Sequence, residues 1–292
     1  MSLSRRRWAS WARTSSERHE SVNRILFEKD EIRDGVATFG GERAEHVLRV
    51  LHGEVGQVLK TGEIDGPVGT SEIVSISGEA ASQPLVENLP SISVRCAHAE
   101  PSRRPWVDLI LAPPRPRVMK RLLPQLAALG VGRIFLVGAK KVEKDFWGAT
   151  LLKPENYRPL LIDGLMQAGT SILPTLETRR NFRKFVKEKL DALWPAAKRI
   201  VAHPYAAKDL RRETTDARLP SSVSRPSGLV SQVLSPPPRL LLAVGPEGGW
   251  TDEEVALLEE HGFSRYSLGS RILRTDTATI ALLAQLMKDF DR

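Results

Sequence analysis

The sequence contains little cysteine and no long apolar run. Cys96 is the one cysteine among 292 residues, which excludes an internal disulfide and leaves no CxxC pair for a structural zinc ion. The longest apolar stretches, residues 240–244 and 278–287, are far shorter than the roughly 18 residues that a membrane-spanning helix needs. The sequence therefore predicts a protein without a bound metal or a membrane partner, and its cysteine content suits a reducing compartment.

The composition is that of a folded and basic protein. Hydrophobic residues make up 41% and charged residues 27%, which is enough apolar surface to bury a core and excludes a wholly disordered chain. At roughly 150 residues per domain, the length predicts about two domains. The formal net charge is +8, and the commonest anionic partner of such a protein is a nucleic acid, although a basic solvated surface explains the same charge.

The first 22 residues are predicted to form a basic, flexible tail. Residues 1–24 contain six arginines and two glutamates and lack the apolar centre of a secretory signal. An arm that binds nucleic acid, a misplaced start site and an organelle transit peptide all have this composition. The tail therefore leaves the compartment open between the cytoplasm, which we expect, and a mitochondrion or plastid.

Residues 23–99 are predicted to form a small β-barrel-like domain. Short runs rich in valine and isoleucine favour strands at residues 24–28, 36–39, 55–60, 68–77 and 92–97. Between them, apolar residues recur at helical spacing over residues 42–51, which predicts one helix. Several short strands and a single helix are typical of a small barrel. Residues 100–105, with two prolines and two arginines, are predicted to be the hinge to the next domain.

Residues 105–292 alternate between strand-like and helix-like segments. Strand patterns occur at residues 107–112, 133–137, 199–202, 240–244 and 266–268, and helical spacing at residues 118–129, 157–168, 182–193, 252–261 and 277–290. Strands alternating with helices of this length predict an α/β domain with a mostly parallel sheet covered on both faces. Residues 206–238 are rich in serine, proline and arginine, and we predict a flexible, exposed insertion there.

The strongest local motif is LLLAVGPEGGWTDEE at residues 240–254. A buried strand leads into a loop with Gly245, Gly248 and Gly249, and Thr251 and Glu254 have capping-box spacing at the start of the next helix. The glycines let a ligand approach the backbone, whose free N–H groups become donors. The loop lacks the residues of a phosphate-binding P-loop, so it predicts either a neutral or cationic ligand held by backbone groups or a turn that binds nothing.

A second motif, LGSRILRTDTA, spans residues 268–278. An irregular segment with Arg271 and Arg274 follows a predicted strand, and Asp276 lies at the start of the last helix, where capping alone explains an acidic residue. Both motifs follow the carboxyl ends of predicted strands. Because ligands of α/β sheets bind at these ends, we expect the two loops to form one pocket.

GPEGGWTDEEV together with LGSRILRTDTA resembles the motif pair of the RsmE family, the SPOUT-class methyltransferases that act on N3 of a uridine in 16S ribosomal RNA. HVLRVLHGEVGQV at residues 46–58 is similar to the family's PUA-like RNA-binding domain, and LAALGVGRIFLV at residues 126–137 to the start of its catalytic domain. The resemblance implies a PUA-like domain at residues 23–99 and a trefoil-knotted SPOUT α/β domain at residues 105–292. It also implies S-adenosylmethionine (SAM) as methyl donor, and a homodimer that acts on RNA of the small ribosomal subunit.

The resemblance implies roles for individual residues. The adenosine end of SAM is expected to contact Val244, Gly245, Gly248, Gly249, Leu268, Gly269, Ile272 and Leu273. Arg274 is expected to orient an RNA phosphate or stabilise a uracil oxygen, and Asp276 is a candidate catalytic base for the N3 proton. The cations expected to contact RNA phosphates are Arg24, Arg49, Arg115, Arg117 and Lys120.

The chain departs from the family pattern at three places. Ala128 replaces a glutamate before Leu-Gly-Val, residues 166–170 keep only the glutamine of a Glu-Gln-Ser-x-Arg motif, and Asp276 replaces a glutamate. Two other hypotheses therefore stay open. One is a non-catalytic protein that binds RNA or assists ribosome assembly, and the other is a SPOUT enzyme that methylates a different position, such as a ribose 2′-hydroxyl.

Overall fold

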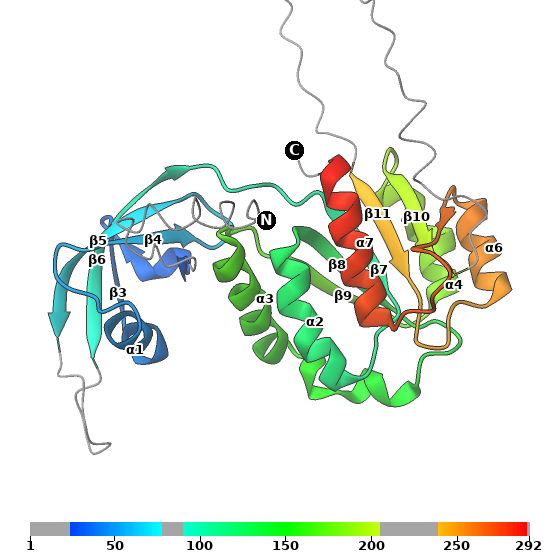
Figure 1. Cartoon of the computed structure of the whole chain (residues 1–292), viewed down its shortest axis with the longest axis horizontal. Helices are drawn as coiled ribbons and strands as arrows, with labels where there is room; N and C mark the ends of the chain where they lie inside the picture. Colours follow the sequence, from blue (N-terminus) through cyan, green and yellow to red (C-terminus); the bar gives the residue numbers. More distant parts are fainter. Residues whose placement is uncertain (1–23, 78–89, 205–238, 291–292) are drawn as a thin grey trace, which may run out of the picture. The chain divides into compact units, whose positions relative to one another are not determined.

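The chain divides into two compact units. The computed structural model describes residues 24–77, 90–204 and 239–290 (Figure 1). The first unit comprises the residues up to Glu63 together with Val68–Glu100, and the second comprises Ile64–Pro67 and the chain from Pro101 onward. The predicted tail at residues 1–22 and the predicted insertion at residues 206–238 lie outside the described residues.

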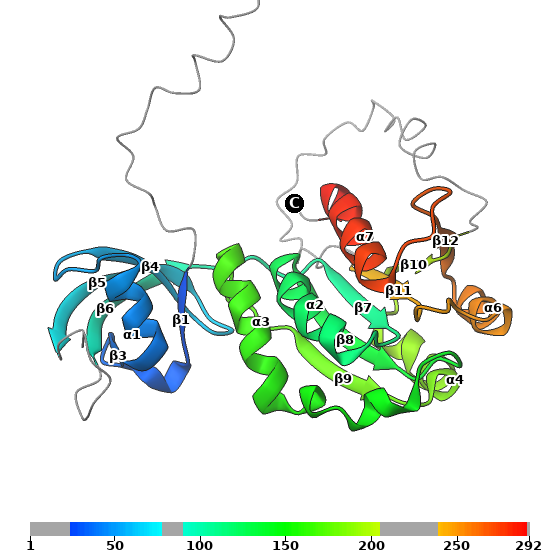
Figure 2. The ribbon, with the colours of Figure 1, turned by 60° about the horizontal axis from the view of Figure 1, so that its bottom comes forward.

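The first unit is a curled six-stranded sheet that forms a half-barrel around one helix (Figure 2). Its elements are β1 (Ile25–Phe27), a 3-10 turn (Lys29–Glu31), β2 (Ile32–Arg33), β3 (Val36–Phe39), α1 (Gly41–Arg49), β4 (Val58–Glu63), β5 (Val68–Ser77) and β6 (Ser91–Glu100). The strand order is β1-β4-β5-β6-β3-β2, with β1 parallel to β4 and the other pairs antiparallel. Phe27, Ile73 and Ile92 from the strands pack with Val47 of α1 to form the core.

The second unit is a six-stranded parallel sheet between two layers of helices. Its strands are β7 (Val107–Leu111), β8 (Val131–Val137), β9 (Thr175–Arg179), β10 (Lys198–Ala202), β11 (Leu240–Val244) and β12 (Ser264–Tyr266), in the order β12-β10-β11-β7-β8-β9. One face carries α2 (Pro116–Ala128), α3 (Pro154–Ala168) and α7 (Thr275–Phe290), and the other carries α4 (Phe182–Phe185) and α6 (Asp252–Glu260) (Figure 1). This arrangement confirms the predicted fold class, while the knot stays a prediction.

The helix pair α2 and α3 packs closely because of a glycine. A side chain at Gly164 of α3 would place its first carbon 2.0 Å from the carbonyl oxygen of Pro124 in α2, so a larger residue would push the two helices apart. Leu161 and Leu165, on the same side of α3, are buried. Gly164 therefore allows the two helices to approach each other closely at Pro124.

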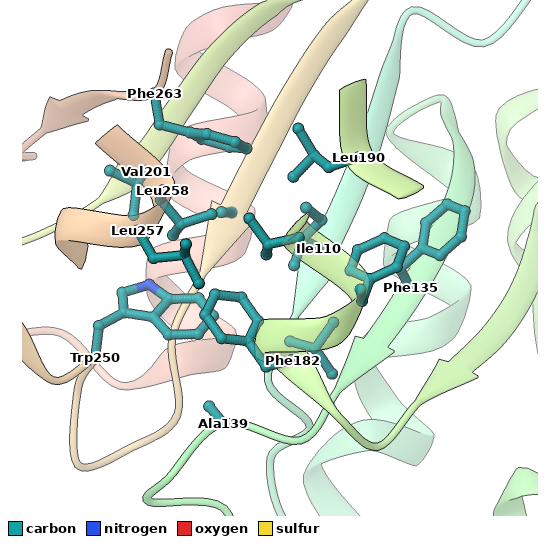
Figure 3. Packing of buried hydrophobic residues seen from close by; sticks show 14 of the residues in the cluster. Ile110, Phe135, Ala139, Phe182, Leu190, Val201, Trp250, Leu257, Leu258 and Phe263 are labelled. Atoms are coloured by element: carbon teal, nitrogen blue, oxygen red, sulfur yellow. The ribbon is translucent and has the colours of Figure 1, made fainter. Parts of the chain in front are cut away.

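An aromatic core fills the face of the sheet below α4 and α6. Trp250 and Phe182 stack with their ring centroids 5.1 Å apart (Figure 3). The rings of Phe135 and Trp194 meet edge to face, with their centroids 5.1 Å apart. Ile110 contributes to this core from β7, whereas its neighbours Leu109 and Leu111 point to the opposite face, as the two-residue period of a strand requires. Because Trp250 follows the glycine-rich loop directly, the core anchors one end of that loop.

Four elements of the second unit differ from their prediction: β9, two 3-10 turns and β12. β9 and the two 3-10 turns at Lys144–Gly148 and Thr150–Leu152 were absent from it, since their polar and half-exposed residues show no apolar period. β12 ends at Tyr266 instead of reaching Leu268. Gly269 has a φ of 127°, which only glycine adopts readily, and this turn takes residues 267–269 out of the strand. In the described residues, no helix has the length and apolarity that a membrane crossing requires.

Candidate functional site

A cavity of about 460 Å³ opens at the carboxyl ends of β10, β11 and β12. Its walls are the ends of these strands, the loops that follow them and the first turns of α7. The lining residues are Lys141, Ala202, His203, Pro204, Val244–Trp250, Asp252, Tyr266–Gly269, Arg271–Leu273, Thr275, Ala278 and Leu282. The cavity therefore lies where the parallel sheet predicts a ligand.

The glycine-rich loop depends on glycine at two positions in different ways. Gly249 has a φ of 73°, in the left-handed region, and its N–H donates to the carbonyl of Pro246 at 2.8 Å. A side chain at Gly245 would approach the Trp250 ring at 3.0 Å. Gly248 differs from both, because a side chain there would meet only the flexible stem of Lys141, whose ammonium donates to the Gly248 carbonyl at 2.8 Å.

Glu254 fixes the helix that follows this loop. The Thr251 hydroxyl accepts from the Glu254 N–H at 3.3 Å, and Glu254 Oε2 accepts from the Thr251 N–H at 2.9 Å, which completes the predicted capping box. The other carboxylate oxygen, Oε1, accepts from the backbone N–H of Lys140 at 2.8 Å. Glu254 is buried, and its two carboxylate oxygens accept hydrogen bonds from different segments. The side chain therefore connects the loop after β8 to the start of α6.

Thr275 joins the second motif to the first. Its buried hydroxyl donates to the carbonyl of Gly245 at 3.1 Å, and the Thr279 hydroxyl, one turn further along α7, donates to the Thr275 carbonyl at 2.7 Å. The Ser267 hydroxyl sits 3.0 Å from the carbonyl oxygens of both Pro204 and Gly269. These bonds hold the segments after β10, β11 and β12 together around the cavity.

The structure brings together the residues that the two motifs predicted for the cofactor. All eight of them, from Val244 to Leu273, line the cavity. Sequence analysis missed Lys141, Trp250 and the segment Ala202–Pro204. The segment Ala202–Pro204 carries no motif. The rule that ligands bind at the carboxyl ends of strands applies to β10 as well, and this rule could have predicted that the segment lines the cavity.

The two predicted catalytic residues lie apart from this cavity. Arg274 lines a second cavity of about 380 Å³ with Arg115, Glu247, Ile272 and Leu273. Asp276 is absent from the lining of both cavities, and its Oδ1 accepts from the N–H of Thr277 at 3.0 Å. The same oxygen is 3.7 Å from Arg274 Nε, so this carboxylate pairs with the arginine and with the first turn of α7.

The cations predicted to bind RNA have different surroundings. Arg24 donates through Nη1 to the carbonyls of Thr61 and Gly69, and burial lowers the pKa of its guanidinium. Arg49 is exposed in the last turn of α1. Arg115 is 3.7 Å from Glu143, and the exposed Arg117 and Lys120 line a shallow cavity with Asn156. The contacts of Arg24 indicate a role in joining β1, β4 and β5, so we leave it out of the proposals below.

Among the described residues, no three His, Cys, Asp or Glu side chains gather in a group that could hold a metal ion. The charged groups of the two cavities are instead separate cations and carboxylates: Lys141, Arg271, Glu247 and Asp252 in the first, and Arg115, Arg274 and Glu247 in the second. Such an arrangement can bind and orient polar groups of a ligand and exchange a proton with it.

Comparison with known proteins identifies the class of this site. Residues 101–287 match the model of the RNA methyltransferase domain family. This range covers more than half of the chain and contains every lining residue of both cavities. The chain therefore belongs to the RNA methyltransferase domain family.

Relatives along the whole chain define the family more narrowly. The ribosomal RNA small subunit methyltransferase E of Treponema pallidum is 30% identical over 91% of both chains. The corresponding enzyme 1 of Borreliella burgdorferi is 24% identical over 89% of this chain and 95% of that relative. The chain belongs to the ribosomal RNA small subunit methyltransferase E family, which confirms the predicted RsmE resemblance.

Solved structures share the fold. The Neisseria gonorrhoeae ribosomal RNA small subunit methyltransferase E, crystallised with S-adenosyl methionine, superposes with a TM-score of 0.64 at 19% identity and covers 92% of this chain and 98% of its own. A Legionella pneumophila protein described as a methyltransferase, in complex with SAM, gives a TM-score of 0.63 at 24% identity and covers 91% and 97%. At these identities the likeness concerns the fold.

Proposed function

We propose that this protein transfers a methyl group from SAM to N3 of a uridine in the RNA of the small ribosomal subunit. The observation that carries the proposal is that both sequence motifs line the cavity of about 460 Å³, in a chain that belongs to the ribosomal RNA small subunit methyltransferase E family. The two structures crystallised with SAM have the same fold and support the same cofactor.

The residues of the first cavity fit SAM. Its volume of about 460 Å³ is within the roughly 300–1,000 Å³ typical of ligand pockets. Trp250 lines the cavity, and its buried indole N–H has no acceptor among the described residues, so it is a donor available to a ligand. Leu268, Leu273 and the glycine backbone supply apolar walls and further hydrogen-bonding groups. When bound, SAM supplies an electrophilic methyl group on a sulfonium centre.

The chain's own part in the reaction is to position the acceptor and to stabilise charge. Uridine N3 carries a proton in its neutral form and becomes a good nucleophile as that proton is lost. Negative charge then develops on the uracil oxygens, and the guanidinium of Arg274 is the group that we assign to stabilise it or to bind the neighbouring phosphate. Asp276, 3.7 Å from Arg274 Nε, is assigned as a positioning residue for that guanidinium.

RNA capture is assigned to both units. The half-barrel of residues 24–77 and 90–100 acts as the PUA-like RNA-binding domain, with Arg49 among its exposed cations. In the second unit Arg115, Arg117 and Lys120 contact phosphates. Such contacts supply affinity without sequence choice, so RNA binding weakens as salt rises.

We also propose a homodimer that works in the cytoplasm. Ile272, at the rim of both cavities, is 76% exposed, and an interface beside the site would bury this apolar side chain. The Arg-rich segment before residue 24 leaves a mitochondrion or plastid as the alternative compartment.

Nucleoside analysis tests the proposed function. We expect the small-subunit RNA of a strain that lacks this protein to have lost 3-methyluridine, and the purified protein to restore it with SAM. Loss of a ribose-methylated nucleoside instead would assign another acceptor atom. Calorimetry that detects no heat with SAM or its demethylated product would favour a non-catalytic RNA-binding protein.

A further inference from the structure

The second cavity combines residues of both motifs with Arg115, which lies outside them. It measures about 380 Å³ and adjoins the first, with which it shares Glu247, Ile272 and Leu273. Its remaining lining residues are Arg115, from the loop that follows β7, and Arg274, directly before α7. Two arginines therefore reach one cavity from elements that are far apart in the sequence, with a carboxylate between this cavity and the first.

Both guanidinium groups have donors left for a ligand. Arg115 lies 3.7 Å from Glu143, and Arg274 lies 3.7 Å from Asp276, distances that attract but are longer than a hydrogen bond. The side chains of Arg115 and Arg274 are 66% and 64% exposed. Paired arginines with available donors match the geometry of a phosphate, which accepts two parallel N–H groups from each guanidinium.

Glu247 is the acid that faces both cavities. It is exposed, it lines both of them, and no hydrogen bond or ion pair commits its carboxylate within the described residues. Asp276 lines neither cavity and already accepts a backbone N–H. A base for the acceptor must lie within hydrogen-bond reach of the proton that it removes, and this geometric condition favours Glu247 over Asp276.

We infer that the second cavity is the acceptor-nucleotide site, in which Arg115 and Arg274 bind the phosphate beside the target uridine and Glu247 accepts the N3 proton. This inference rests on the proposed function. The N3–H bond breaks and its proton passes to the Glu247 carboxylate, while the N3 electron pair forms the bond to the methyl carbon. The carbon–sulfur bond breaks, its electron pair stays on sulfur, and the proton later leaves Glu247 for solvent.

The first test separates chemistry from cofactor binding at Glu247. We expect Glu247→Gln to lower single-turnover methylation of small-subunit RNA by about 100-fold or more while SAM affinity, measured by calorimetry, stays within about threefold. Glu247→Asp should retain part of the rate. Glu260→Gln, an exposed change at the end of α6, is the matched control.

The second test concerns the arginine pair. We expect Arg115→Ala to raise KM for RNA by about tenfold at unchanged SAM affinity, and to reduce the slope of log affinity against log salt by about 1. Lys187→Ala removes one exposed cation on the opposite helix layer and should change neither quantity.

The outcomes distinguish the two proposals. A wild-type protein that neither binds SAM nor methylates RNA contradicts the proposed function itself. If the wild type is active, Glu247→Gln with full activity overturns the inference. Equal losses of SAM affinity and turnover would also overturn it, because they would assign Glu247 to the cofactor.

Discussion

Charged side chains at the two ends of the parallel sheet in the second unit differ in burial and in the number of their partners within the protein. At the amino ends, Asp108 of β7 is completely buried, and its Oδ2 accepts from Arg133 Nε at 2.9 Å, Arg133 Nη2 at 2.7 Å and Trp194 Nε1 at 2.7 Å. Its Oδ1 lies 3.7 Å from Arg239 Nη2. At the carboxyl ends, Arg115, Arg274 and Glu247 line open cavities with weaker or no internal partners among the described residues.

This difference separates structural charge from functional charge. A buried carboxylate is tolerated only where cations and hydrogen-bond donors surround it. Asp108 meets that condition through Oδ2, while its buried Oδ1 has the Arg239 cation nearby but no hydrogen-bond donor among the described residues. Charged groups that lack such partners and face a cavity are available to a ligand. The sequence alone does not distinguish structural from functional charged residues. An aspartate inside an apolar strand and a glutamate in a glycine-rich loop are both candidates for a functional role.

The largest effect is expected at the amino ends. Asp108→Asn removes the charge that Arg133 and Arg239 surround and leaves these cations without compensation, so we expect a loss of about 3 kcal/mol in the free energy of unfolding. Urea denaturation measures this loss, and SAM affinity at low temperature should stay unchanged. Asp289→Asn, an exposed change in the last turn of α7, is the control. A stable variant with lost SAM binding would contradict a purely structural role of Asp108.

The next effect is expected at the glycine-rich loop. Gly248→Val should weaken SAM binding by about 100-fold, because its side chain occupies the cavity and displaces only the flexible Lys141. The melting temperature should change little. Gly148→Val is matched to it, since a side chain at Gly148 meets nothing within 4 Å, and it should leave both quantities unchanged. Unchanged affinity in Gly248→Val would contradict the cofactor site.

Arg274→Ala tests whether the two cavities have separate roles. We expect Arg274→Ala to lower turnover by about 30-fold and to change SAM affinity by less than about threefold, since Arg274 lines only the acceptor cavity. Steady-state kinetics and calorimetry on the same preparation measure both. Equal losses would move Arg274 to the cofactor site.

The smallest effect is expected from a group of three charged or titratable side chains at the amino ends, of which only Asp191 is exposed. Hydrogen bonds from Arg199 and His261 lower the pKa of Asp191, so the folded state binds this proton less readily than the unfolded state. The stabilisation is present above the ordinary value of 3.8 and is lost as the pH falls through the lowered pKa. Asp191→Asn should therefore lower the melting temperature slightly at pH 6, and the difference from the wild type should shrink on acidification. A difference that grows as the pH falls would contradict this assignment.

The prediction of the fold succeeded where apolar patterns are continuous. β7, β8 and β11 are almost entirely buried and were found within two residues of their bounds. β9 was missed because Thr175–Arg179, at the edge of the sheet, has no buried residue and only one apolar side chain, Leu176. The loops at residues 244–250 and 268–273 line one cavity, because glycines mark both and parallel strands bring their ends together, while their role in binding a cofactor stays a prediction.

The sequence by itself determined most of the strands and helices, the family and the pair of loops that form the first cavity, because these depend on local spacing and on motifs that are continuous in the chain. The tertiary structure decided which charged side chains are paired within the protein and which remain available to bind a ligand. Asp108 and Arg133 meet across two strands, Thr275 reaches Gly245, and Arg115 joins Arg274 at one cavity. Each of these relations joins residues separated by 25 positions or more, and only the packing of the sheet and its helices brings them within reach.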